Sequence, residues 1–459
     1  MIPHCRLAFD RKHPFCDTTT TMQPVRRVVA STAGLRAPGV FTCRRCLTRL
    51  PLPAQQHQQR RALSGSAPRN AAPPGLYPAG IAELSSRKLI SVSGPDAAKY
   101  LQGVITANLT PGYAGPNPTS EHLRTDAGFY AAFLTAQGRI LHDVFIYRDV
   151  RDPSHPPGHS WLVEVDAAEA DRLQKHIKRY KLRAKFDVRL LDEGEGRVWH
   201  AWDDANPSSL PTPPSSTSSS SIITTPDTRA PNLGHRLLTF SPTTTNPPSS
   251  LAPLPILSEV SYRLRRYAHG IAEGQAELLY NTALPHESNL DAAGAIDFRK
   301  GCYVGQELTI RTEHRGVVRK RILPCVLYPD AEGVTAPEGV GYQSTIGGVG
   351  SEGEGEGEGG VVTAEMVPAE ASIGRVGRKG RSAGKWLGGV GNLGLALCRL
   401  EIMTDVVLPG ETGGTGFVEG DEFVVGLGGE EGGGEGKKVR IKAFVPDWLR
   451  SALANKEAH

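Results

Sequence analysis

The chain has 459 residues, of which 39% are hydrophobic and 22% are charged, and its formal net charge is +4. The charge is unevenly distributed, because residues 1–63 contain eleven lysines and arginines against two acids, which leaves residues 64–459 with −5. An acidic body argues against nucleic acid as the main partner, since phosphate binding needs clustered cations on a folded domain, and the lack of any run of about 18 apolar residues argues against a membrane span.

Residues 1–63 have the composition of a targeting segment. They are rich in Arg, Thr, Ala and Gln, and they contain no acid after Asp17. Such a composition is typical of a mitochondrial transit peptide, and residues 60–64, RRALS, resemble the cleavage site of a matrix protease. We therefore expect a transit peptide over residues 1–63 and a mature protein in the mitochondrial matrix. A basic arm without a targeting role is the alternative.

Residues 80–204 are predicted to form a first α+β domain. Apolar runs bounded by turn residues predict strands over residues 88–93, 129–135, 140–148, 161–165 and 186–191. One helix is expected after Pro95, and a second carries Leu173, Ile177 and Tyr180 at helical spacing. This order of strands and helices predicts an α+β layer with antiparallel pairing.

The next segments differ sharply in composition. Residues 205–255 are rich in Ser, Thr and Pro and contain few apolar anchors, so we expect an inserted, mostly disordered segment. Residues 256–316 are assigned to a second α+β domain that begins with a helix. The arginines of this helix, Arg263, Arg265 and Arg266, could form a solvated face or include one buried anion clamp.

The remaining residues, 317–459, contain short apolar runs separated by many glycines. This pattern predicts a small C-terminal β-barrel. Residues 347–360 and 426–436 interrupt it with Gly and Glu, a composition that is too flexible and too charged to pack. We expect both stretches to be solvated loops.

The densest candidate site is the run KGCYVGQE at residues 300–307. Gly301 and Gly305 flank Cys302, so the backbone could approach a ligand or a partner closely. The residues after Gly305 have helical character, and a helix start together with the cation of Lys300 would favour a thiolate at Cys302. A thiolate can act as a nucleophile or can bind iron or an iron–sulfur cluster. A buried, unreactive thiol is the alternative.

Two neighbouring residues form a weaker candidate. His142 and Asp143 are adjacent on an expected strand, so their side chains point to opposite faces and at most one can reach a given pocket. We expect His142 at the strand surface, whereas Asp143 could make a structural hydrogen bond or contact a ligand.

The motif and its surroundings resemble a known family. Residues 298–312, FRKGCYVGQELTIRT, resemble the signature of the folate-binding YgfZ family. The continuation at residues 313–321, EHRGVVRKR, is similar to the mitochondrial branch of that family, which comprises iron–sulfur cluster assembly factors, some of them classed as transferases. Supporting similarities lie in residues 92–103, 132–139, 284–290 and 392–397.

The resemblance implies a fold, a role and a set of site residues. The fold is that of the aminomethyltransferase (T-protein) of glycine cleavage, a cloverleaf of two α+β halves and a C-terminal β-barrel around a folate-sized channel. The role is a late step in the maturation of [4Fe-4S] proteins alongside A-type cluster carriers. By position, Cys302 is the family cysteine, and the surrounding motif residues are Lys300, Gly301, Tyr303, Gly305, Gln306 and Glu307. Asp143 and Arg266 match positions that would contact tetrahydrofolate, whereas His142 replaces a second acid of the T-protein relatives.

Three hypotheses follow for the function. The first is an assembly factor that uses Cys302 to hold or hand over a cluster shared transiently with a carrier, because the mature chain keeps only Cys302, Cys325 and Cys398 while a [4Fe-4S] cluster is usually held by four thiolates. The second is an enzyme that transfers a one-carbon unit to or from tetrahydrofolate with Asp143 as the base. The third is a folate-binding module without catalysis. We favour the first.

Overall fold

The computed structural model describes residues 72–109, 128–151, 156, 158–210, 222–240, 247, 251, 253–347, 361–377, 380–408, 416–428 and 437–457. All of them belong to the second of the two units into which the chain divides, residues 62–459. The expected transit peptide and most of the two expected Gly/Glu-rich loops lie outside the described residues.

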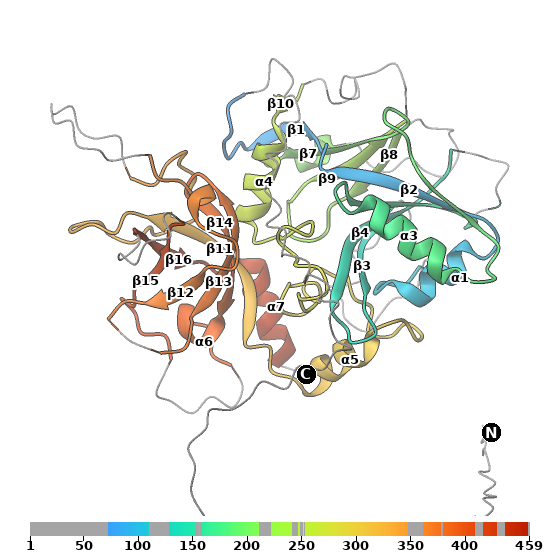
Figure 1. Ribbon diagram of the computed structural model, residues 1–459. Helices are drawn as coiled ribbons and strands as arrows, with labels where there is room; N and C mark the ends of the chain where they lie inside the picture. The colour runs from blue at the N-terminus through green and yellow to red at the C-terminus, as the bar shows by residue number, and fades with distance from the viewer. Residues whose placement is uncertain are drawn as a thin grey trace, which may run out of the picture. The chain divides into compact units, whose positions relative to one another are not determined.

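The first sheet has five strands in the order β3-β4-β5-β2-β6, and all neighbours pair antiparallel (Figure 1). Its strands and helices are β2 (Arg87–Ser93), α1 (Ala97–Val104), β3 (Gly128–Leu134), β4 (Ile140–Arg148), β5 (Ser160–Asp166), α3 (Ala170–Tyr180) and β6 (Asp187–Leu190). Leu101 of α1 and Leu173 and Ile177 of α3 pack with alternate apolar residues of the strands, which places both helices on one face of the sheet. The strands and helices expected here from hydrophobic spacing are confirmed.

The second sheet also has five strands, in the order β10-β1-β7-β9-β8. Only the β1–β10 pair is parallel among the pairs of this sheet in the described part of the chain. Its elements are β1 (Ala79–Glu83), β7 (Arg197–Asp203), η1 (Pro207–Ser209), β8 (Ile222–Pro226), β9 (His235–Thr239), β10 (Ile256–Leu257) and the following helix α4 (Glu259–Ala268).

This sheet corrects the expected domain boundaries. Strand β7 and all but the first residue of β1 lie within residues 80–204, assigned to the first domain. Yet β1 pairs with β10 of the expected second domain, and β7 pairs with β9 of the segment expected to be disordered. Residues 222–240 belong to the segment expected to be disordered, yet they form β8 and β9. The Thr-rich composition of β8 suggested a loop, but threonine is β-branched and suits a pleated strand. In β9, the charge of Arg236 is paired inside the protein, which allows a charged residue within a buried strand.

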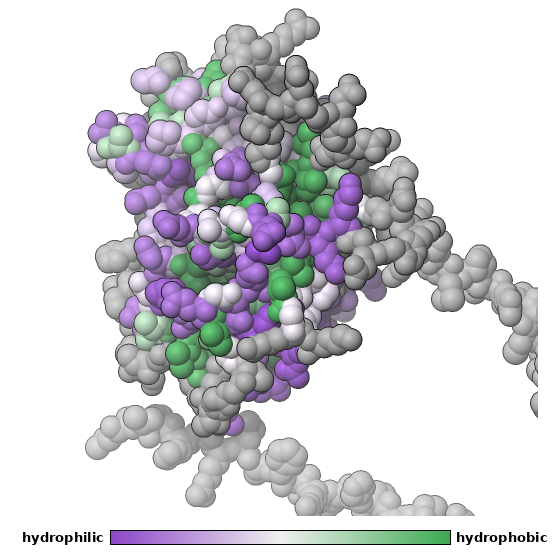
Figure 2. Space-filling model, turned by 90° about the vertical axis from the view of Figure 1, so that its left-hand side faces the viewer, coloured by the Kyte–Doolittle hydropathy of each residue, from purple (hydrophilic) through white to green (hydrophobic). Residues whose placement is uncertain are grey.

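The C-terminal residues form the expected β-barrel, which is closed, with strand order β11-β14-β13-β12-β15-β16. The elements from the motif onward are α5 (Gln306–Arg315), β11 (Lys320–Tyr328), η3 (Ala364–Met366), β12 (Ser372–Arg375), β13 (Gly384–Val390), β14 (Leu393–Arg399), α6 (Leu400–Met403), β15 (Phe423–Gly426), β16 (Lys438–Ala443) and α7 (Asp447–Glu457). Leu323, Trp386 and Ile441 fill the barrel interior. On the barrel side of the molecule, Figure 2 shows hydrophobic residues interspersed with hydrophilic ones, and single exposed apolar residues of this kind need no special role.

One apolar cluster connects the three parts. It contains Tyr130 of β3, Trp202 of β7, Tyr262 of α4, and Ile322 and Leu395 of the barrel. Burial of such large side chains is the main favourable term in folding, so the two sheets and the barrel stabilise one another. No helix among the described residues combines the length and the apolar composition that a bilayer crossing requires.

Candidate functional site

Cys302 lies in the loop that precedes α5, and its side chain is exposed. The helix begins at Gln306, directly after Gly305 in a left-handed conformation, so the expected helix start near the cysteine is confirmed. The alternative of a buried thiol is wrong. The described residues contain two further cysteines, Cys325 and Cys398, and both are buried inside the barrel with their Sγ atoms 3.8 Å apart. Burial raises the pKa of Cys325 well above its ordinary value, which keeps that thiol protonated. Cys302 is therefore the thiol in the described structure that a partner can reach.

The motif residues hold this loop in place rather than surround the sulfur with free charges. Lys300 donates from Nζ to the carbonyl oxygens of Ile105 at 2.7 Å and Ala107 at 2.8 Å, which ties the loop to the segment after α1. The Tyr303 hydroxyl shares a hydrogen bond of 2.8 Å with Thr309 of α5. Because these contacts lie on either side of Cys302, they fix the loop and leave its tip exposed.

Two other motif residues, Gln306 and Glu307, stabilise the start of α5. The backbone N–H of Tyr303 donates to the Gln306 side chain at 3.2 Å, which satisfies a loop donor at the start of the helix. Glu307 is exposed on the first turn of α5, where a negative charge is favourable to the helix dipole.

The two glycines of the motif differ in their surroundings. Gly305 has φ of +84°, and a Cβ there would overlap the Thr135 carbonyl oxygen and lie 2.8 Å from Leu134. The β3–β4 turn therefore packs directly against the start of α5. A Cβ on Gly301 would meet no atom within 4 Å, so this side of the cysteine is open to a visiting molecule.

We expect Gly305→Ala to lower the free energy of unfolding by at least about 2 kcal/mol, because it adds left-handed strain to an overlap with β3. Gly301→Ala is the matched control, with an expected change within about 0.5 kcal/mol. Urea unfolding of the two variants and the native protein measures the difference. Equal stability of both variants would show that the turn and the helix do not pack as described.

Asp143 and Arg266, the residues matched to folate contacts, are both buried and engaged inside the protein. Asp143 accepts a hydrogen bond from the Gly274 N–H at 3.0 Å and pairs with Arg87 at 3.4 Å. Arg266 donates to Glu277 at 2.9 Å and to the Ile271 carbonyl at 2.8 Å. Both side chains thus form ion pairs inside the protein, and their contact with tetrahydrofolate stays a prediction.

The same region corrects two other expectations. His142 is buried, not at the strand surface, and its ring packs on Tyr280 with 5.5 Å between ring centroids. Burial lowers its pKa to about 3. Arg265 and Arg266 are also buried, so the α4 arginines do not form a solvated face; Arg265 pairs with Asp204 at 2.5 Å.

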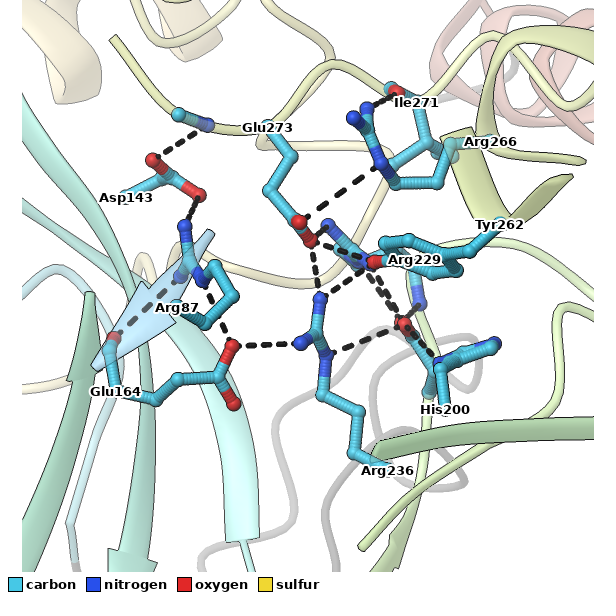
Figure 3. A network of polar contacts seen from close by, with 12 residues as sticks. Arg87, Asp143, Glu164, His200, Arg229, Arg236, Tyr262, Arg266, Ile271 and Glu273 are labelled. Carbon is cyan, nitrogen blue, oxygen red and sulfur yellow. Dashed lines mark hydrogen bonds and ion pairs between the residues drawn. The ribbon is translucent and has the colours of Figure 1, made fainter. Parts of the chain in front are cut away.

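Asp143 and Arg266 belong to a buried network of charges that joins the two sheets (Figure 3). Arg87 of β2 pairs with Glu164 of β5 at 2.8 Å, and Glu164 in turn pairs with Arg236 of β9 at 2.6 Å. The network continues from Arg236 to Glu273. Its members are four arginines, Arg87, Arg229, Arg236 and Arg266, and five carboxylates, Asp143, Glu164, Asp227, Glu273 and Glu277.

The arginines keep two of these carboxylates, Asp227 and Glu273, ionised. Burial alone would raise the pKa of Asp227, but the adjacent Arg229 lowers it to about 2. In the same way burial opposes ionisation of Glu273, yet Arg236 and Arg229 hold its pKa well below the ordinary value. Sequence reasoning missed this network. One signal in the sequence could have indicated it. Glu164 is a charged residue within the apolar strand β5, and a charged residue that is buried needs a partner of opposite charge.

A second polar group consists of His286, Asp291 and Glu313, whose ligand-type atoms lie within 4.8 Å of one another. The Asp291 carboxylate, however, accepts hydrogen bonds of 2.6 and 2.9 Å from Arg321. The fixed positive charge of Arg321 opposes a bound cation. We therefore assign this group a structural role at the start of the barrel.

Comparisons with known proteins agree with the fold and with the resemblance of the cysteine motif. The chain is 82% identical over 453 residues to a protein of Chaetomium globosum named "Iron-sulfur cluster assembly factor IBA57 homolog, mitochondrial", covering 95% of this chain and 100% of the relative. A protein of the same name from Pyricularia oryzae is 53% identical, covering 92% of this chain and 95% of the relative. Another from Neurospora crassa is 48% identical, covering 94% of this chain and 93% of the relative. The chain belongs to the IBA57 family of mitochondrial iron–sulfur cluster assembly factors.

Two further findings concern the fold. Residues 319–451 match the family model described as the CAF17 C-terminal beta-barrel domain, in agreement with the closed barrel. The solved structure of the glycine cleavage system aminomethyltransferase T from Bartonella henselae is 12% identical with a TM-score of 0.50, covering 81% of this chain and 86% of that chain. At this identity the likeness shows the fold alone, and it confirms the expected aminomethyltransferase-like architecture.

Proposed function

We propose that this assembly factor matures [4Fe-4S] proteins in the mitochondrial matrix by holding an iron–sulfur cluster jointly with an A-type carrier, with Cys302 as its own ligand to iron. The observation that carries the proposal is the exposure of the Cys302 thiol at the tip of a loop that is fixed on both sides. The process, iron–sulfur cluster assembly, is inferred from the names of the relatives, which are iron–sulfur cluster assembly factors.

Shared ligation follows from the number of thiols. A [4Fe-4S] cluster is usually held by four thiolates, whereas the described structure presents one exposed cysteine and buries two others. The carrier must therefore supply the remaining ligands, and the cluster is cargo rather than a resident cofactor. Binding replaces the proton of the Cys302 thiol with iron, and that proton leaves to solvent. No oxidation or reduction is required for this step.

Folate is not part of the proposed mechanism. Binding of tetrahydrofolate, one-carbon transfer with Asp143 as the base and a purely folate-binding role all stay predictions of the resemblance. Asp143 and Arg266 are paired with neighbours in this structure, so nothing in their geometry favours these alternatives over cluster sharing.

The proposal predicts that Cys302→Ser weakens cluster sharing by at least about tenfold, because serine removes the soft ligand and keeps the size. The apo protein is mixed with a cluster-loaded A-type carrier from the same organism. Visible absorption then reports the cluster, and size exclusion with light scattering reports the complex. The native protein should elute with the carrier and the cluster together.

The matched control is Cys398→Ala, which removes a buried thiol and should leave cluster sharing unchanged. In cells depleted of the protein, the native chain and this control should restore matrix [4Fe-4S] enzymes, and Cys302→Ser should not. Native-like behaviour of Cys302→Ser in both assays would remove Cys302 from the mechanism.

A further inference from the structure

Helix α5 begins four residues after Cys302 and presents positive charge to solvent in the turns that follow the exposed Glu307. Arg311 and Arg315 are exposed and lie four residues apart, which places them on one side of the helix. Arg319 is exposed in the segment that follows the helix. We call these three residues the α5 arginine face. In the part of the chain that the structure describes, their guanidinium groups have no ion pair or hydrogen bond with another residue.

This charge is local rather than a property of the whole surface. Residues 64–459 carry −5, yet residues 311–321 contain five arginines and lysines and one acid. Two of the five are used within the fold, because Lys320 pairs with Glu287 and Arg321 pairs with Asp291. The other three are the α5 arginine face. A cluster of unpaired cations on an acidic protein creates a potential that attracts an oppositely charged surface.

Exposed apolar side chains lie at both ends of the helix. Val304, two residues after Cys302, is 42% exposed, and Val317, just beyond the end of α5, is 44% exposed. Arginines next to apolar side chains are enriched at protein interfaces, where lysines are depleted. The composition of this surface therefore favours a protein partner.

The dimensions allow one partner to cover both the cysteine and the arginines. Helix α5 has ten residues and is thus about 15 Å long. A standard interface buries about 800 Å² on each partner, which corresponds to a patch roughly 30 Å across. Such a patch extends from the Cys302 loop to the end of the helix.

We propose that the α5 arginine face docks an acidic protein surface that carries an iron–sulfur cluster, and that this contact brings the cluster to Cys302. The proposal rests on the shared-cluster function and adds the chemistry of the partner. Thiolate ligands make the cluster site itself electronegative, so the arginines complement both the cargo and the acidic residues around it. The contact steers association, whereas Cys302 retains the cluster after the two proteins have met.

The test reverses the charge of the face with Arg311→Glu, Arg315→Glu and Arg319→Glu in one chain. The control variant carries the same charge change on the barrel, with Arg381→Glu, Lys437→Glu and Lys438→Glu, three exposed cations. The probe is the cluster-loaded A-type carrier from the same organism, and stopped-flow fluorescence gives association rate constants at low and at high salt. A third variant with glutamine at the three α5 positions covers the case in which three glutamates disturb the helix, which circular dichroism detects.

We expect the reversal to lower the association rate constant at low salt by at least about tenfold, and the glutamine variant to fall between it and the native protein. The barrel control should stay within about twofold of the native rate. Salt should slow the native protein and have little effect on the reversal variant. Cys302→Ser should associate at the native rate and yet lose the cluster.

Other outcomes separate the two proposals. If the reversal and glutamine variants both associate at the native rate while Cys302→Ser still loses the cluster, the α5 arginine face is not the docking surface and cluster sharing stands. If the native protein does not associate with the carrier, both proposals fail. Vesicles containing phosphatidylserine are the alternative partner. The native protein would then bind the vesicles and the reversal variant would not, while both would associate with the carrier at the same rate. That outcome would assign the face to a membrane surface and overturn the proposal.

Discussion

Replacement of Arg236 by methionine is expected to lower the free energy of unfolding by about 3–5 kcal/mol. Arg236 is completely buried on β9, where it donates to Glu164 at 2.6 Å and to the Tyr262 hydroxyl at 2.7 Å and pairs with Glu273. Methionine has a similar length and fills the space, but it brings no charge. Two buried carboxylates would then lose a cation that they share, and water cannot take its place.

The size of the effect follows from the charge balance of the network. Four arginines face five carboxylates in the native network, so the carboxylates already outnumber the arginines by one. Without Arg236 the five carboxylates face three arginines. Glu273 depends most on this change, because Arg236 is the leading cation that offsets its burial and keeps its pKa low.

Urea unfolding of the native protein and the variant measures this loss. Arg450→Met is the matched control, since Arg450 is partly exposed and pairs with Asp405 on the surface, and its expected cost is below about 1 kcal/mol. The double variant Arg236→Met with Glu273→Gln should recover part of the stability, because it also removes a stranded carboxylate. A loss of less than about 1 kcal/mol for Arg236→Met alone would contradict a closed, dry network.

The network also bears on the cysteine site through the strands that carry it. Asp143 lies on β4 and pairs with Arg87 of β2, which lies two strands away in the same sheet. The turn that joins β3 to β4 packs against Gly305 at the start of α5. Strand β4 therefore connects the buried charges to the helix that follows Cys302. Through this connection the network helps to hold the Cys302 loop in one position, as a loop that offers a ligand to a partner requires.

The sequence predicted those features whose signal is local. The spacing of Leu173 and Ile177 is enough to identify α3, because both residues pack on the same sheet face. The helix start near Cys302 also followed from neighbouring residues, since glycine at position 305 and the helical residues after it define the turn, whereas the exposure of the thiol was left open by the sequence and is decided by the structure. The family motif then supplied the fold.

The features that sequence did not predict depend on distant partners. Arg236 and Thr225 lie in the segment that was expected to be mostly disordered, yet Arg236 pairs with Glu164, which lies 72 residues earlier, and Thr225 is buried in β8. Arg266 is buried because Glu277 is available across the turn after α4. His142 is buried because Tyr280 covers it. Burial of a polar residue is decided by whether the folded chain brings it a partner, and composition carries no information on that point.

Acidification from pH 7 to pH 5 is expected to lower the free energy of unfolding by about 4 kcal/mol through His142 and His200 alone. Burial lowers the pKa of His142 to about 3 and that of His200 to about 3, although Asp227 opposes the shift at His200. In the unfolded chain a histidine binds its proton near pH 6.5. Between these values the unfolded state binds more protons than the folded state, so stability falls as the pH falls.

The window from pH 7 to pH 5 separates the histidines from the carboxyl groups whose pKa is depressed. Asp227 and Glu273 contribute stability that is lost mainly below about pH 5, whereas Asp143, whose pKa burial raises, takes up its proton in the folded state above pH 3.8 and acts in the opposite direction to the histidines. Three further histidines have pKa values lowered mainly by burial and add to the loss with the same sign: His176, His235 and His269.

Urea unfolding at several pH values measures the slope, which should reach about 2.7 kcal/mol per pH unit near pH 5 from His142 and His200 alone. His142→Gln removes one of the two protons, so the loss between pH 7 and pH 5 should shrink by about 2 kcal/mol. A free energy of unfolding that stays constant from pH 7 to pH 5 would show that the two rings are not held neutral inside the protein, and the dry interior inferred around the charge network would be wrong with it.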